Sequence, residues 1–218
     1  MIRYDRNRRR FAVALAAMAG FVDAVGFLSA DGYFVSFMSG NTTRLGVDLG
    51  TDVVRAVTPA FLIAGFVAGV TGGALLSIRA GRYRKPAVLA LVAALLLAGA
   101  TARALGLPAA MLATLVMAMG AINNTFQRDG EVAIGLTYMT GALVKLGQGL
   151  AGWLAGRKDR AGGKDLGWLS WAALWGGLLS GAVLGAMAQD RMPMACLWIA
   201  GCWATAMVGV AMRLPAES

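Results

Sequence analysis

VSFMSGNTTRLG, residues 35–46, and LTYMTGALVKLG, residues 136–147, are two copies of one motif. They lie 101 positions apart without a gap, and nine of the twelve pairs are identical or conservative. The same offset pairs Asp23, upstream of the first copy, with Asn124. In a chain as apolar as this one, a repeat built around a Gly-interrupted polar segment indicates a binding site where two repeats meet.

The composition predicts an integral membrane protein. Of 218 residues, 58% are apolar and only 14% are charged, and the mean hydropathy is +0.66. A soluble domain carries about 25% charged residues. The net charge of +9 sits in short clusters between apolar runs, so it reflects membrane orientation rather than nucleic-acid binding, which we exclude.

The residues that usually hold cofactors are scarce. The chain has no histidine, which excludes His-ligated metal sites, haem and His-dependent catalysis. Cys196 and Cys202 lie six positions apart in one apolar run and do not suggest a disulfide framework. We therefore expect no metal and no cofactor.

Six apolar runs are long enough to cross the ~30 Å of bilayer hydrocarbon. They cover residues 11–30, 58–78, 86–103, 108–127, 166–188 and 193–213. Arg8-Arg9-Arg10 before the first run could also belong to a cleaved export signal. Five further runs follow and no soluble domain remains to be exported, so we interpret the first run as a membrane helix.

The basic clusters predict the topology. They occupy residues 3–10, 79–85 and 157–164, and cytoplasmic loops collect such residues. The three clusters share one side only if segments 33–50 and 134–155 enter the membrane and return. The prediction is therefore an all-α protein with six crossings in the bacterial inner membrane and both termini cytoplasmic.

This topology makes residues 1–107 and 108–218 two inverted three-helix repeats, each with a Gly-broken re-entrant segment. The alternative is eight crossings in two parallel halves, which puts one basic cluster outside. Glycines recur every four residues in the second and fifth runs, and we interpret them as helix-packing positions rather than a homodimer seam. They are Gly65, Gly69, Gly73, Gly177, Gly181 and Gly185.

Asp23 is the only carboxylate inside a long apolar run. A charge there costs about 2.5–3.5 kcal/mol on insertion scales, so such residues normally face a cavity or a partner. One interpretation is coupling to a proton or cation, or contact with a basic substrate. The other is a structural bond to Asn41, Thr42 or Asn124 that locks the two halves together.

Hydroxyls and amides surround the repeated motif and are candidates for the binding site, with Gly40 and Gly141 as hinges. They serve equally well as interhelical hydrogen-bonding groups, worth about 0.6 kcal/mol each. The candidate binding residues are Asp23, Ser39, Asn41, Thr42, Asn123, Asn124, Gln127 and Thr140.

Arg44 and Lys145 occupy matched positions after the two glycines. They are candidate gating or anion-attracting charges. The alternative is that each side chain snorkels to its own membrane surface, which is the stronger reading for Arg44 because Asp48 and Asp52 lie close by.

The block FVDAVGFL followed by GYFVSFMSGNTTRLGV resembles the signature of the YoaK-like family. Its most specific part is the run from Phe37 to Thr42 with Asp23 upstream. The resemblance extends over nearly the whole chain and implies a small multi-pass protein of the bacterial inner membrane. It implies no substrate or mechanism, because the family is a domain of unknown function.

These observations predict a small secondary transporter or channel-like permease, not an enzyme. A small solute or ion would bind near the bilayer midplane between the two repeats, and a homodimer is plausible. The first alternative is a membrane scaffold or sensor subunit that transports nothing. The second is an intramembrane serine enzyme with Lys145 as base to Ser36 or Ser39.

Overall fold

A computed structural model of the chain describes residues 6–128, 131–132, 135–156 and 167–214. Within these ranges almost all regular structure is helical. The helices are α1 (Arg6–Ser29), α2 (Met38–Thr51), α3 (Val57–Ala80), α4 (Arg84–Ala104), α5 (Pro108–Ile122), α6 (Met139–Leu154), α7 (Trp168–Arg191) and α8 (Cys196–Arg213).

Short elements complete the fold between these helices. A 3₁₀ turn, Gly81–Tyr83, joins α3 to α4, and another, Asn123–Thr125, follows α5. Two antiparallel strands, β1 (Gln127–Arg128) and β2 (Glu131–Val132), then lead toward α6. The sequence analysis did not predict this small ladder.

Each of the six predicted apolar runs overlaps one α-helix of the structure. Four described stretches combine the length and composition needed to cross a membrane: Asn7–Ser29, Val57–Ala104, Trp168–Arg191 and Cys196–Arg213. The second stretch contains both α3 and α4. The fourth predicted run, 108–127, is helical only to Ile122, so α5 is about 22 Å long at 1.5 Å per residue. The number of crossings therefore remains a prediction.

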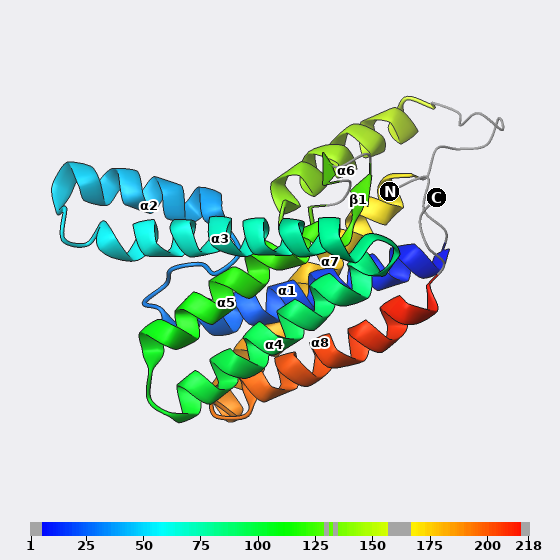
Figure 1. Ribbon diagram of the computed structural model, residues 1–218. Coiled ribbons are helices and arrows are strands. Elements are labelled where there is room, and N and C mark those ends of the chain that lie inside the picture. Colours follow the sequence, from blue (N-terminus) through cyan, green and yellow to red (C-terminus); the bar gives the residue numbers. More distant parts are fainter. Residues whose placement is uncertain (1–5, 129–130, 133–134, 157–166, 215–218) are drawn as a thin grey trace.

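The helices α1, α4 and α5 form the centre of the bundle (Figure 1). Helix α1 packs mainly on α7, α3 mainly on α5, and α4 on both α5 and α8. Fully buried side chains from α1 and α5, including Leu15, Met18, Leu115 and Met119, fill the core. Helix α2 lies along α3, and α6 lies along α7.

Local sequence signals explain the sharp turn between α4 and α5. Gly106 has φ +70°, a left-handed conformation that glycine adopts without strain. Pro108 then begins α5 at a position where its missing N–H is harmless. The short span from Ala104 to Pro108 thus ends α4 and starts α5.

The predicted glycine rows are packing positions, as expected. Gly177, Gly181 and Gly185 of α7 lie against Val13, Ala17 and Phe21 of α1, in the same order along both helices. Helices α1 and α7 are therefore parallel.

The second row of glycines packs α3 against α5 in the same way. Gly65, Gly69 and Gly73 of α3 lie against Val116, Met117 and Ala121 of α5, again in the same order. Helices α3 and α5 are also parallel. Small residues at these positions let two helix backbones approach closely, which is the usual way that membrane helices associate.

The predicted clustering of positive charge at one end of the bundle holds for the described residues. The start of α1, the turn between α3 and α4, the start of α7 and the end of α8 all lie at one end (Figure 1). Arg9 donates to Ser170 Oγ at 3.3 Å there, which ties the start of α1 to the start of α7. Residues 157–164, the third predicted cluster, are outside the described residues.

Candidate functional site

The chain breaks after α1 at a turn, not at Gly40. Asp31 has φ +48° and Gly32 has φ +80°, and residues 30–37 then fold back along α1. Val35 is fully buried and packs directly against Gly26. The left-handed turn reverses the chain within the bundle, and α2 begins only afterwards, at Met38.

Asp23 holds this returning segment in place. Its Oδ1 accepts the backbone N–H of Val35 at 2.9 Å and of Ser36 at 2.7 Å. Buried backbone donors that are not part of a helix need such partners, above all in a membrane. The carboxylate therefore has a clear structural role, but its partners are not the Asn41, Thr42 or Asn124 that the sequence analysis suggested.

Asn41 secures the same segment from the side of α2. It is fully buried, its Oδ1 accepts the Phe34 N–H at 3.1 Å, and its Nδ2 donates to the Phe34 carbonyl at 2.6 Å. Both backbone groups of Phe34 are therefore satisfied by one side chain. Asp23 and Asn41 together bind three consecutive residues of the break, Phe34 to Ser36.

A second break follows α5 and has a similar lock. The Oδ1 atom of Asn123 accepts the Thr137 N–H at 3.4 Å and the Thr137 hydroxyl at 3.2 Å. Asn123 and Thr137 are both buried. Thr137 is the counterpart of Ser36 in the repeat, so Asn123 performs the task that Asp23 performs in the first half.

This correspondence corrects the gap-free alignment by one residue. Asn124, which the alignment pairs with Asp23, donates to the Val70 carbonyl of α3 at 3.0 Å and so faces a different helix. Asn123 and Asn124 lie in the 3₁₀ turn, where a shift of one position turns a side chain by about 120° around the axis. The second half therefore has one residue more than the first between the acceptor and the repeated motif.

The predicted hydroxyls lie on the outside of α2 and α6. Ser39, Thr42 and Thr140 are exposed, and the Thr42 hydroxyl donates to the Met38 carbonyl of its own helix at 2.8 Å. None of them is among the hydrogen-bond partners of Asp23 in the described part of the chain, which are Val35 and Ser36. The side chain of Gln127 lies outside the described part of the structure.

The two predicted hinges lie inside helices. Gly40 and Gly141 are each the third residue of their helix, α2 and α6. The ring of Phe37 fills the space next to Gly40, whereas no described residue outside the backbone of α6 comes within 4 Å of the β-carbon position of Gly141. The bends lie upstream of both glycines.

Arg44 and Lys145 each lie over an aromatic ring. The Arg44 guanidinium is 4.8 Å from the centre of the Tyr33 ring, and the Lys145 ammonium is 4.5 Å from that of Trp171 on α7. Such cation–π contacts contribute about 0.5–1 kcal/mol at exposed sites. Tyr33 in turn donates to Asp48 at 3.4 Å, so Arg44 belongs to a small polar group at its own end of the bundle.

Sequence reasoning missed two features of the site. Thr137, in the second copy of the repeated motif, is not among the candidate binding residues, yet it is the residue that Asn123 binds. Thr125 is fully buried, and its hydroxyl has no hydrogen-bond partner among the described residues. A repeat alignment reports which residues are similar and does not report either of these side-chain environments.

The described residues contain no group of three or more His, Cys, Asp or Glu that could hold a metal ion. The roles of the candidate residues in binding a solute or ion remain predictions. Their described geometry is that of two buried locks, one at each break, with exposed polar residues on the short helices that follow.

Comparison with known proteins gives two matches of interest. A family described as a protein of unknown function, DUF1275, matches residues 11–210. The UPF0700 transmembrane protein RA0705 of Rhizobium meliloti (strain 1021) is 35% identical over 216 residues, covering 96% of this chain and 91% of that protein. No solved structure matches the chain.

Proposed function

The chain belongs to the DUF1275 family and is a multi-pass membrane protein, and we propose that it is a small permease. In this proposal it acts as a secondary transporter or channel for a small solute or ion. It is built from two inverted three-helix repeats, each with a re-entrant segment that starts at the break. It lies in the bacterial inner membrane with both termini cytoplasmic.

The helix contacts support an inverted repeat. Exchanging α1 with α5 and α3 with α7 converts the α1–α7 contact into the α5–α3 contact. Two glycine contacts are equivalent under this exchange. Gly20 of α1 lies against the Leu178 carbonyl of α7, and Gly120 of α5, 100 positions later, lies against the Phe66 carbonyl of α3. The same spacing of 100 relates Asp23 to Asn123.

The directions of the helices support the inversion. Phe11, near the start of α1, stacks edge-on against Phe126, just past the end of α5, with ring centres 5.9 Å apart. Helices α1 and α5 thus run in opposite directions, as members of inverted repeats must. Parallel repeats, as in the eight-crossing alternative, would make them run the same way.

The single observation that carries the proposal is the pair of side-chain locks at the two breaks. Transporters with inverted repeats bind solutes and ions where helices are interrupted inside the membrane. Both backbone N–H groups bond to Oδ1 of Asp23, and the second carboxylate oxygen has lone pairs that can bind a proton or a cation. A proton or cation on that oxygen would withdraw charge from Oδ1 and weaken its bonds to Val35 and Ser36, which would couple ion binding to the conformation of residues 30–37.

The two locks differ in a way that suits this role. The first uses a carboxylate and the second uses a neutral amide, although both accept a backbone N–H. A neutral acceptor is sufficient for the structure of a break, as Asn123 illustrates. The charge of Asp23, costly in a membrane, then calls for a functional explanation.

The experiment compares wild type with Asp23→Asn in a thermal-shift screen of purified protein. The probes are Na⁺, K⁺, Mg²⁺, chloride, amino acids, sugars and polyamines. We expect at least one probe to raise the Tm of wild type and not that of Asp23→Asn, because ligands stabilise the state that binds them. Proteoliposomes should then take up that probe with wild type only.

The matched control is Asp31→Asn, an exposed carboxylate at the adjacent turn, which should respond like wild type. If no probe shifts the Tm and no flux is measured, the scaffold or sensor alternative is favoured. The serine enzyme alternative is tested by labelling with a fluorophosphonate, which should not depend on Lys145 if the permease proposal is right.

A further inference from the structure

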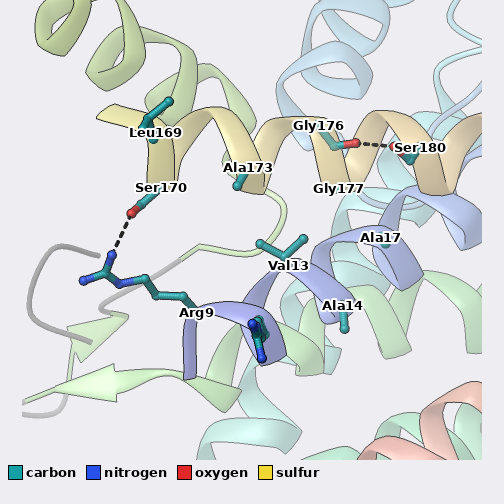
Figure 2. Close-up of a pocket in the computed structure, with 11 residues that line it drawn as sticks. Arg9, Val13, Ala14, Ala17, Leu169, Ser170, Ala173, Gly176, Gly177 and Ser180 are labelled. Carbon is teal, nitrogen blue, oxygen red and sulfur yellow. Dashed lines mark hydrogen bonds between the residues drawn. The ribbon is translucent and has the colours of Figure 1, made fainter. Parts of the chain in front are cut away.

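A groove runs between α1 and α7 at the basic end of the bundle (Figure 2). Its volume is about 680 Å³. Its floor consists of small residues from both helices. Because their side chains are short, a hollow remains on the outer side of the two closely packed backbones. These floor residues are Ala14, Ala17, Ala173, Gly176, Gly177 and Ser180.

The basic end of the groove carries two arginines and a hydroxyl. Arg9 and Arg10 of α1 line it together with Ser170 of α7, whose Oγ is 3.3 Å from a guanidinium nitrogen of Arg9. Figure 2 shows Arg9 reaching across the groove to Ser170. Guanidinium groups bind phosphate oxygens with paired, charge-assisted hydrogen bonds.

The rest of the groove is apolar and has the length of one leaflet. From Leu169 to Ser180 the helix rises about 16 Å, and half of the hydrocarbon core is about 15 Å thick. The groove therefore combines a cationic end with an apolar trough about as long as one acyl chain. The cationic end would lie at the level of the lipid headgroups of that leaflet.

We propose that the α1–α7 groove binds an anionic phospholipid of the leaflet at the basic end. Its phosphate would contact Arg9, Arg10 and Ser170, and one acyl chain would lie over Ala173 and Gly176. Basic pockets between membrane helices on the cytoplasmic side are typical sites for anionic headgroups. The orientation rule alone explains the charge of these arginines, but not the hollow beside them.

This site does not depend on the permease function. It would fix α1, which carries Asp23, against α7, and the two helices form the most extensive contact in the bundle. A lipid in the groove would fill the space that their small residues leave open. The binding free energy would then stabilise the folded bundle.

The test measures binding of phosphatidylglycerol and phosphatidylcholine to purified protein in detergent, by native mass spectrometry and by thermal shift. Wild type should retain phosphatidylglycerol at least tenfold better than phosphatidylcholine. The double variant Arg9→Gln/Arg10→Gln should lose that preference. The control Arg79→Gln/Arg82→Gln, at the same end but outside the groove, should keep it.

A second pair of variants tests the trough. Apart from the backbone of its own helix, no described atom lies within 4 Å of the β-carbon position of Gly176, so Gly176→Leu should fill the groove without disturbing the fold. We expect it to reduce phosphatidylglycerol binding at least tenfold. Gly72→Leu, an equally open glycine on α3, is the control. If Gly176→Leu does not fold, Ser180→Leu, exposed in the same groove, replaces it.

Four outcomes would overturn the proposal. One is equal retention of both lipids by wild type. Another is that the control variant Arg79→Gln/Arg82→Gln loses the preference for phosphatidylglycerol as fully as Arg9→Gln/Arg10→Gln does. A third is full stabilisation by inorganic phosphate alone, which would indicate a site for a free anion. The fourth is a dimer that Gly176→Leu disrupts while lipid binding stays unchanged, which would make the groove a contact between two copies of the chain.

Discussion

Gly69 of α3 lies directly against the backbone of Met117 on α5, so a β-carbon at position 69 would collide with the Met117 carbonyl. For Gly72, one turn along the same helix, no atom of the described residues outside the backbone of α3 lies within 4 Å of the β-carbon position. The two glycines therefore serve different purposes although both lie in one apolar helix. Only the first is required by packing.

Gly69→Ala should lower the free energy of unfolding by about 1–3 kcal/mol, because the new methyl group meets backbone that cannot move aside. Gly72→Ala should be neutral or stabilising by up to about 1 kcal/mol, since alanine is the better helix former. Titration with SDS in mixed micelles, followed by tryptophan fluorescence, measures both. Equal effects of the two substitutions would contradict the packing assignment.

The helices themselves could be predicted well from hydropathy. The predicted runs 58–78 and 86–103 lie inside α3 and α4, Val57–Ala80 and Arg84–Ala104. Long apolar runs have one stable solution in lipid, a helix that satisfies its own backbone. The glycine rows were equally readable, because close helix packing requires small residues at a fixed spacing.

The breaks could be located only roughly. The repeat is most similar around Gly40 and Gly141, and glycine suggests flexibility, but both residues lie inside the first turn of a helix. The actual reversal uses Asp31 and Gly32, which the second copy does not match. Backbone bends depend on which side chains can bind the freed amides, and sequence similarity does not report those contacts.

Replacing Asp23 separates its structural role from its charge. Asp23→Asn keeps an oxygen that can accept from Val35 and Ser36, as Asn123 does for Thr137, so its stability should be within about 1 kcal/mol of wild type. Asp23→Ala leaves two buried amides without a partner and should cost about 2 kcal/mol or more. Thermal and SDS unfolding measure the difference. Equal losses for both variants would mean that the fold itself requires the charge.

Asn41 and Thr42 are neighbours with opposite surroundings, which makes them a matched pair. Asn41→Ala removes both partners of the partly buried Phe34 backbone and should destabilise by about 1–3 kcal/mol. Thr42→Ala removes an exposed hydroxyl that bonds within its own helix and should stay within about 0.5 kcal/mol of wild type. Unfolding free energies that are the same for the two variants would contradict the assignment of Asn41 as a lock.

The proposed orientation is tested with single cysteines in a chain that carries Cys196→Ala and Cys202→Ser. The positions are Asn7 at the start of α1, Arg82 in the turn after α3, and Val54, 82% exposed, in the loop before α3. A membrane-impermeant maleimide added to intact spheroplasts should label Val54→Cys. It should label Asn7→Cys and Arg82→Cys only after permeabilisation, because basic ends stay cytoplasmic.

With six crossings, positions 7 and 82 are separated by two crossings and share a side. With eight, α2 crosses as well and the two positions lie on opposite sides, so labelling of only one of them from outside would replace the inverted repeat with parallel halves.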